Sequence, residues 1–274
     1  MKPAPRQSTL KAAAAISGQG LHTGEHCNLT LHPAEPGTGV VFSTPRGEIR
    51  AIVGNLSDTR RGTNLRSGDA EIHTVEHLLS ALAGLGVDNV FIEADGIEVP
   101  ICDGSALPFV ELIESVGIEE QPVEANVIHL SEPVWATHAD KYLLAMPAND
   151  LTIRAFIAFA HPMIGEQAVS FSIDPEVYKR EIAPARTFCT SDEIEYILSQ
   201  GLGRGGTEDN VIVAYNDHYS VPLRFKDELV RHKVLDLIGD LSLLGGRLCA
   251  DITGIKTSHT LNTALACKIA DRQL

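Results

Sequence analysis

Two long amphipathic segments stand out in the pattern of hydrophobic and polar positions along the chain. Apolar residues recur at helical spacing over 74–85 and again over 225–244, and a glycine follows each segment, at Gly86 and at Gly245. Glycine directly after the last apolar position is typical of a helix C-cap, because it adopts a left-handed conformation without strain. The pattern therefore predicts one long helix in each half of the chain.

Shorter segments complete the expected elements. Residues 108–116 predict a helix, and Thr190 and Glu193 have the spacing of a capping box that opens another helix. Residues 58–69 predict a polar loop, and residues 119–124 predict a linker. Short alternating or β-branched runs predict strands at residues 27–32, 40–42, 49–53, 89–93, 127–130, 142–146, 151–159, 168–173, 210–215 and 251–255.

The two long helices can be aligned with each other at an offset of 159 residues. This alignment places His77 on Asp236 and Gly86 on Gly245. Any two amphipathic helices that end in glycine share part of such a match. The sequence therefore leaves open whether the chain contains an internal repeat.

The composition and the charge exclude several classes of protein. The chain has 274 residues, 44% of them hydrophobic, and a formal net charge of −14, which excludes a nucleic-acid binder that works through bulk positive charge and disfavours disorder. The best candidate for a membrane span, Leu78–Val87, is too short to cross a bilayer, and the N-terminal segment lacks the core of a signal peptide. The five cysteines form no CxxC pair. We therefore expect reduced thiols in a cytoplasmic protein without stable membrane insertion.

One stripe of the second long helix carries ionisable side chains. His232, Asp236 and Asp240 follow one another at intervals of four residues, on a helix whose other faces are largely apolar. A buried carboxylate without a partner is costly, so this stripe needs a counter-charge. Two interpretations remain open, a hydrogen-bonded His–Asp pair at the solvent edge or the ligands of a metal ion.

The first long helix opens with a second polar cluster. Glu76 and His77 combine a carboxylate that can accept a proton from water with an imidazole that can ligate a metal. With His73 they also form the HxxEH pattern of the inverted zinc peptidases, although a polar first helical turn without any chemistry fits the same residues. His259, in a predicted loop near the C-terminus, is a candidate general acid whose imidazolium Asp240 could hold.

Together with several further motifs, these clusters resemble the UDP-3-O-acyl-N-acetylglucosamine deacetylases, the zinc amidases that commit a sugar nucleotide to lipid A synthesis. The resemblance runs from about Gly18 to Lys268, in order and without a large gap. Its motifs are Gly18-Gln19-Gly20-Leu21-His22-Thr23-Gly24, the helical segment from Thr74 to Gly86, Val99-Pro100-Ile101-Cys102-Asp103-Gly104-Ser105-Ala106, Ala185-Arg186-Thr187-Phe188, the segment from Arg231 to Asp240, and Lys256-Thr257-Ser258-His259.

The resemblance implies a hydrolytic site with one zinc ion per chain. It implies that His77, His232 and Asp236 hold the zinc and leave a fourth position open, as a catalytic zinc requires. Glu76 is similar to the family's general base, which takes a proton from water.

Four further residues receive roles from the same resemblance. His259, oriented by Asp240, is similar to the group that stabilises the developing charge and protonates the leaving amine. Thr187 resembles the hydroxyl donor to the tetrahedral oxyanion, and Lys233 resembles a residue that positions the substrate.

The resemblance also implies contacts to an acylated UDP-N-acetylglucosamine substrate. Phe159 would stack on uracil, while Lys141 and Lys256 would face the diphosphate and nearby polar groups. An insert near residues 190–215 would form a passage for the acyl chain, and Phe188 is a further expected substrate contact. The apolar face of that passage would carry Ile194, Ile197 and Leu198.

Three positions depart from the pattern of the family. Ser258 stands before the last catalytic histidine, where glycine is common, and Cys189 stands where glycine is frequent. Ala158 precedes Phe159, where an acid is expected. These departures affect the expected recognition of the nucleotide and the acyl chain more than the expected chemistry.

We predict an α+β fold with two similar domains, residues 1–121 and 122–274, each of which layers helices against β-sheets. The active site would lie between the two domains of a monomer. One alternative is a zinc peptidase, which needs His73 as a ligand and can dispense with Asp236. The other is a non-catalytic nucleotide-sugar binding protein in which zinc is structural.

Overall fold

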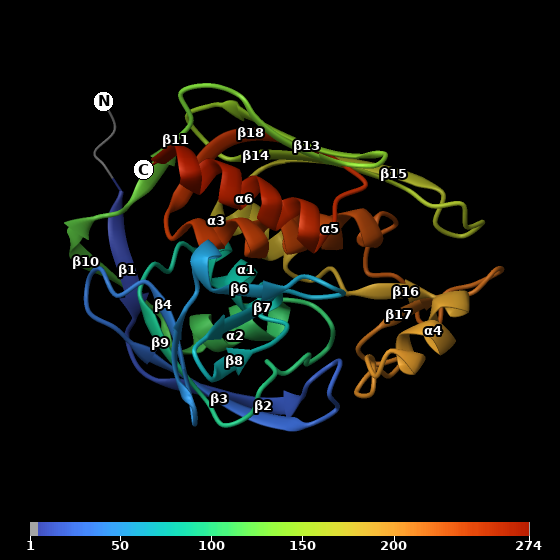
Figure 1. Cartoon of the computed structure of the whole chain (residues 1–274), viewed down its shortest axis with the longest axis horizontal. Helices are drawn as coiled ribbons and strands as arrows, with labels where there is room; N and C mark the ends of the chain where they lie inside the picture. The colour runs from blue at the N-terminus through green and yellow to red at the C-terminus, as the bar shows by residue number, and fades with distance from the viewer. Residues whose placement is uncertain (1–4, 274) are drawn as a thin grey trace.

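The computed structural model describes residues 5–273 and places the main helices between two β-sheets (Figure 1). The first sheet has the strand order β2 (Ala14–Gln19), β3 (His26–Pro33), β9 (Val90–Ala94), β4 (Val40–Thr44) and β5 (Gly47–Arg50). The second has the order β12 (Val134–His138), β13 (Lys141–Pro147), β18 (Arg247–Ile255), β14 (Thr152–Ala158) and β15 (Glu166–Ser172), and β11 (Val127–His129) pairs with β18. In Figure 1 the first sheet lies below the helices and the second lies above them.

The two sheets have the same topology. In each, two antiparallel hairpins flank a central strand that comes last in the chain, and this strand is antiparallel to the first hairpin and parallel to the adjacent strand of the second. One helix precedes the central strand and another follows it: α1 (Glu76–Leu85) and α2 (Leu107–Val116) in the first half, α5 (Glu228–Leu241) and α6 (His259–Gln273) in the second. The predicted pair of similar α+β halves is confirmed, and the topology contains the repeat that the sequence left open.

Helices α1 and α5 pack directly on each other in the middle of the layers. Every residue of α1 except Ala83 is buried, and Gly239 of α5 lies against the carbonyl group of Glu76, where a Cβ atom would collide with the oxygen. This close approach requires glycine and sets the first turn of α1 against the middle of α5. As predicted, α1 ends at Gly86, which has a φ angle of 73°.

None of the helices within residues 5–273 combines the length and the apolar character needed to span a membrane.

Both halves carry extra elements at the same point of the topology, between the second hairpin and the helix that follows it. The first insert (residues 51–75) contains η1 (Val53–Asn55) and a small sheet of β6 (Leu56–Asp58), β7 (Asn64–Ser67) and β8 (Ala70–Ile72). The second insert (residues 173–227) contains α3 (Pro175–Val177), η2 (Tyr178–Ile182), β16 (Phe188–Thr190), η3 (Ser191–Glu193), α4 (Ile194–Ser199) and β17 (Ile212–Ala214). Figure 1 shows α4, β16 and β17 projecting beyond the layers at one side. Each insert therefore leads directly into one of the two central helices.

Two of the irregular segments predicted from the sequence are wrong. Residues 119–124, expected as a linker, belong to β10 (Ile118–Glu124), which pairs with β1 (Arg6–Leu10). Five of the seven residues of β10 are exposed and three of these are glutamates, which resembles the composition of a linker. The partner strand lies far away in the sequence, so local patterns do not reveal the pairing. The polar loop expected at residues 58–69 contains β7 and the end of β6.

The C-terminal prediction also needs correction, because His259 is the first residue of α6 rather than part of a loop. The apolar side chains that bury one face of α6 follow helical spacing in the sequence: Leu261, Leu265, Ala266 and Ile269. The helix predicted at 225–244 is divided into α5 and the short η4 (Ser242–Leu244).

Candidate active site

Three buried side chains meet where α1 contacts α5. His77 comes from the first turn of α1, and His232 and Asp236 lie one turn apart on α5. Oδ1 of Asp236 lies 3.7 Å from Nε2 of His77 and 3.3 Å from Nε2 of His232. One ligand atom from each residue lies within 4.8 Å of the other two, so the three could hold a metal ion.

The protonation states of these residues suit metal ligation. Burial, reinforced by His232, lowers the pKa of His77 to about 3, and burial also lowers the pKa of His232. Burial alone would raise the pKa of Asp236, but His232, Lys233 and His259 hold it below its usual range. At neutral pH the cluster therefore offers two neutral imidazoles and one carboxylate.

Hydrogen bonding gives independent support for a cation at this position. Nδ1 of His232 lies 3.0 Å from the carbonyl oxygen of Ala185. When Nδ1 donates its proton to this oxygen, Nε2 carries a lone pair that faces Asp236 and is free to bind a metal ion. Within the described residues, Oδ1 of Asp236, which faces Nε2 of both histidines, is buried without a hydrogen-bond partner. Such orphaned atoms are costly, and two imidazoles with one carboxylate are the donor set of a catalytic zinc. The residues present therefore fit a zinc ion.

Two further titratable side chains flank the cluster. Burial raises the pKa of Glu76 to about 7. Burial would lower the pKa of His259, but Asp240, Asp236 and Glu76 raise it to about 10. Nδ1 of His259 donates to Oδ2 of Asp240 at 2.9 Å, while Nε2 lies 3.7 Å from Oε1 of Glu76. A carboxyl group that titrates near neutrality thus faces an imidazolium.

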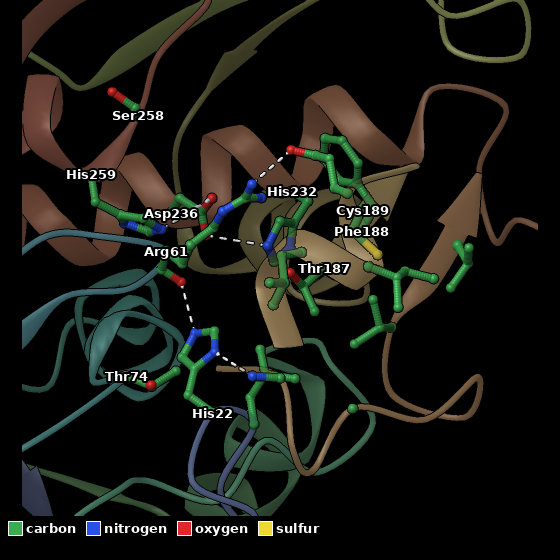
Figure 2. Close-up of a pocket in the computed structure, with 18 of the residues that line it drawn as sticks. His22, Arg61, Thr74, Thr187, Phe188, Cys189, His232, Asp236, Ser258 and His259 are labelled. Carbon is green, nitrogen blue, oxygen red and sulfur yellow. Dashed lines mark hydrogen bonds and ion pairs between the residues drawn. The ribbon is translucent and has the colours of Figure 1, made fainter. Parts of the chain in front are cut away.

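The cluster lies in a cavity of about 580 Å³. Both halves contribute to its wall, as Figure 2 shows for His22, Arg61 and Thr74 from the first half and for Thr187 and His232 from the second. The predicted site residues that line the cavity are Glu76, His77, Lys141, Phe159, Thr187, Phe188, Ile194, Ile197, Leu198, His232, Lys233, Asp236 and His259.

Two predicted site residues lie outside the cavity lining. Asp240 is fully buried behind His259, in agreement with an orienting role. Lys256 is directed elsewhere, because its Nζ donates to Oδ2 of Asp140 at 2.6 Å. Ser258, Cys189 and the adjacent Thr257 do line the cavity.

One part of the cavity wall is apolar. Ile194, Ile197 and Leu198 of the second insert are joined there by Val211 and Val213. The rings of Phe159 and Phe188 meet nearby with their centroids 5.7 Å apart in an edge-to-face arrangement. The cavity therefore joins a polar centre to a surface suited to hydrocarbon.

A buried ion pair holds the segment that carries Thr187. Nε of Arg186 donates to Oε1 of Glu228 at 2.8 Å, and both side chains are almost entirely enclosed. The amide of Thr187 donates to the carbonyl of Gly104 at 2.8 Å, and its own carbonyl accepts from the amide of Ile212 at 2.9 Å. These contacts fix the backbone on both sides of the Thr187 hydroxyl.

Lys233 approaches the cluster from α5. Its Nζ donates to Oδ2 of Asp236 at 2.9 Å and lies 5.4 Å from the centroid of the Phe188 ring. A cation is thereby placed at the edge of the candidate metal site.

Sequence reasoning assigned no role to three residues of the site, His22, Arg61 and Thr63. Nε2 of His22 lies 3.0 Å from the carbonyl oxygen of Arg61, and the guanidinium of Arg61 pairs with Glu193 at 2.7 Å (Figure 2). His22 belongs to a motif visible in the sequence, whereas the other two lie in the segment expected to be a polar loop. Only their tertiary contacts reveal them.

His73, the ligand that a zinc peptidase would need, does not join the cluster. Its Nε2 lies 3.9 Å from Oε1 of Glu71, and the residue is absent from the cavity lining. The group that could hold a metal contains Asp236 in its place. The geometry therefore argues against the peptidase alternative.

Comparison with known proteins agrees with this arrangement. The family model for LpxC, UDP-3-O-acyl N-acetylglycosamine deacetylase, matches residues 7–271. A UDP-3-O-acyl-N-acetylglucosamine deacetylase of Syntrophotalea carbinolica is 40% identical over 269 residues, which cover 96% of this chain and 87% of that protein. Deacetylases of the same name from two strains of Coxiella burnetii are 43% identical, covering 96% and 95% of this chain and 90% and 88% of their own length. The chain belongs to the family of UDP-3-O-acyl-N-acetylglucosamine deacetylases.

Proposed function

We propose that the chain hydrolyses the N-acetyl amide of UDP-3-O-(3-hydroxyacyl)-N-acetylglucosamine and releases acetate, the committed step of lipid A biosynthesis. The observation that carries this proposal is the buried group of His77, His232 and Asp236, with the orphaned Oδ1 of Asp236, beside Glu76 and His259. Family membership supplies the substrate, and the polar centre and apolar wall of the cavity support the assignment of its polar and apolar parts.

In this proposal, His77, His232 and Asp236 hold one zinc ion. Zinc bound there would polarise the amide carbonyl and lower the pKa of water. The described residues of one chain supply the whole set, so the proposal requires no second copy.

Glu76 and His259 divide the proton transfers. Glu76 accepts a proton from the attacking water, since its raised pKa of about 7 makes it a better base than an exposed carboxylate. His259 is the imidazolium that protonates the leaving amine, and Asp240 holds its ring in the required orientation. The positive charge of His259 also stabilises the negative charge that develops on the acetyl oxygen.

Thr187 and Lys233 contribute to the transition state and to substrate position. The Thr187 hydroxyl lines the cavity on a backbone held by Gly104 and Ile212, and we assign it as a donor to the acetyl oxygen. Lys233 offers its ammonium group to polar oxygens of the sugar.

The remaining assignments concern recognition. Phe159 is 36% exposed, so its ring is available to stack on uracil, and Lys141 lines the same cavity. The apolar wall of Ile194, Ile197 and Leu198 is assigned to the acyl chain. Lys256 can join the diphosphate contacts only by giving up its ion pair with Asp140.

The decisive experiment measures acetate release from the synthetic acylated substrate. The purified chain should release one acetate for each deacetylated product, should lose this activity when a chelator removes the metal, and should regain it with zinc. UDP-N-acetylglucosamine without the acyl chain should react far less efficiently. Tight binding of the substrate without any acetate release would instead favour the nucleotide-sugar binding protein.

A further inference from the structure

Thr63, in the first insert, contacts both carboxylates that flank the candidate metal cluster. Its amide donates to Oε2 of Glu76 at 2.9 Å, and its hydroxyl donates to Oδ1 of Asp240 at 2.5 Å. The residue is completely buried. No other residue among those described forms hydrogen bonds with both groups.

We propose that Thr63 is a positioning residue for the reaction, which fixes Glu76 and His259 relative to each other through one hydroxyl and one amide. This inference rests on the proposed function, because it assigns Thr63 a task only if Glu76 and His259 move protons. Thr63 is not one of the candidate metal ligands: its amide holds Glu76, and its hydroxyl, which donates to Asp240, also lies 3.3 Å from Nδ1 of His259.

The hydroxyl of Thr63 acts through Asp240. Nδ1 of His259 donates its proton to Oδ2 of Asp240 at 2.9 Å. The side-chain amide of Asn262 donates to the same oxygen at 2.9 Å. Oδ1 of Asp240 is left for Thr63, whose hydroxyl has one proton to give. Without this donor, only Oδ2 of Asp240 would accept hydrogen bonds, so the carboxylate could rotate more freely. The imidazole ring of His259, which Asp240 orients, would then be less well fixed.

The amide of Thr63 acts on Glu76. This carboxylate is buried at the start of α1, and its pairing with His259 is a longer contact of 3.7 Å between Oε1 and Nε2. The amide therefore holds Oε2 of Glu76, while Oε1 faces the imidazole. Since the same residue also holds Asp240, the distance between base and acid is set by a single rigid residue.

The adjacent glycine gives a second way to disturb this arrangement. A Cβ atom at Gly62 would lie 3.2 Å from Oε1 of Glu76 and 3.5 Å from Oγ1 of Thr74. A methyl group there would displace the carboxylate by a few tenths of an ångström without removing any donor. Displacements of this kind alter catalysis more than folding.

The test compares kcat, KM, zinc content and thermal unfolding for four variants of the zinc-loaded full chain, with the acylated substrate. Thr63→Val keeps the shape and the amide but removes the hydroxyl, and it should lower kcat about ten- to a hundredfold with little change in KM. Thr63→Ser restores the hydroxyl and should recover kcat to within about threefold of the parent chain. Gly62→Ala should also lower kcat, with the zinc retained.

Thr9→Val serves as the matched control. Thr9 is buried in β1, and its hydroxyl donates to the carbonyl of Asn89 at 2.7 Å, away from the cavity. The control should lose stability as Thr63→Val does, yet keep its kcat. An equal loss of kcat in both variants would show that any buried hydroxyl in this chain has the same effect, and it would overturn the proposal.

Two other results would overturn it. A folded Thr63→Val chain with the kcat of the parent would remove the role of the hydroxyl, and a Thr63→Ser chain as slow as Thr63→Val would show that the methyl group matters instead. If Thr63→Val does not fold, Thr63→Ser and Gly62→Ala decide, because normal kcat in Gly62→Ala would show that turnover does not depend on how this segment positions Glu76. Failure of the parent chain to release acetate would refute the proposed function itself, which keeps the two failures apart.

Discussion

The first and second inserts occupy equivalent positions in the topology that the two halves share. They nevertheless contribute different kinds of chemical group near the cavity. The first brings the amide and the hydroxyl of Thr63 to two buried carboxylates. The second brings the apolar side chains of α4. The same position in a repeated fold can therefore supply either polar organisation or an apolar surface, and the proposed reaction needs both.

The two inserts are also held by different forces. Short strands and the hydrogen bonds from Thr63 to two buried carboxylates secure the first, whereas a buried ion pair between Arg186 and Glu228 secures the second. The inserts contact each other through Arg61 and Glu193, an ion pair whose side chains are 38% and 35% exposed. This arrangement predicts which substitutions affect chemistry, which affect stability and which affect substrate recognition.

The largest effect should come from the metal ligands, because their removal abolishes the function that both inserts serve. His77→Ala, His232→Ala and Asp236→Ala should each lose bound zinc and all measurable acetate release, since three protein ligands are the minimum for a catalytic zinc. Elemental analysis of the purified variants provides the measurement, and His32→Ala is the control, because His32 is half-buried on β3 and does not line the cavity. Full zinc occupancy in Asp236→Ala would contradict the ligand assignment.

Breaking the ion pair of the second insert should have the next largest effect, on stability. Arg186→Met leaves the fully buried carboxylate of Glu228 without its counter-charge and should lower the free energy of unfolding by about 3 to 5 kcal/mol in urea titrations. Arg180→Met is the control, because Arg180 is 68% exposed and its pair with Glu181 contributes about 0 to 1 kcal/mol. Equal losses in the two variants would contradict the anchoring role of Arg186.

Glu76→Gln separates the chemistry near the first insert from metal binding. The amide has nearly the same shape but cannot accept the proton, so kcat should fall by about 10²-fold or more while zinc stays bound. Kinetics with the acylated substrate and elemental analysis check both parts, and the exposed Glu93→Gln is the control. Turnover close to that of the parent chain would exclude Glu76 as the base.

A substitution in α4 should instead affect substrate recognition. Ile197→Ala removes part of the apolar wall, and a loss of about 0.8 kcal/mol for each buried methylene predicts a KM several times higher for the acylated substrate. UDP-N-acetylglucosamine without the acyl chain should be unaffected. Tyr196→Ala on the same helix is the control, because Tyr196 is 61% exposed and lies outside the cavity lining. An equal change for both substrates would place the acyl chain elsewhere.

The smallest effect should come from the contact between the inserts. Arg61→Ala removes a partly exposed ion pair, which contributes at most about 1 kcal/mol, so the melting temperature should change little and kcat/KM by only a few-fold. High salt should reduce the difference from the parent chain. Arg60→Ala, at a position 83% exposed and paired with Asp58, is the control. A large loss of activity in Arg61→Ala would give this contact a direct role in catalysis.

Local patterns predicted the parts of the fold that depend on neighbours in the sequence. The helices α1 and α5 follow from apolar periodicity, and the four-residue spacing of His232 and Asp236 places them on one face of α5, whereas their proposed role as ligands came from the family resemblance. Strand β10 could not be found in this way, because its pairing with β1 joins distant residues and its exposed face is charged.

The candidate site residues also differ in whether a local sequence motif or only a tertiary contact reveals them. Thr187 and His259 stand in motifs that the chain shares with a family, whereas Thr63 becomes visible only when the first insert meets α5. The charge of Lys256 is evident in the sequence, but its pairing with Asp140 depends on how two loops approach each other.

The left-handed backbone of Thr74 distinguishes the first half of the repeated fold from the second beside the candidate metal site. At the offset of 159 residues, His73 is the counterpart of His232, so both halves carry a histidine four residues before a candidate ligand. The second half is already helical from Glu228, which aligns its pair on one face. In the first half α1 begins only at Glu76, and Thr74, with a φ angle of 56°, turns the chain between the two histidines. Because of this left-handed residue, His73 and His77 do not lie one helical turn apart as His232 and Asp236 do, and only the second half presents an aligned pair to the proposed zinc site.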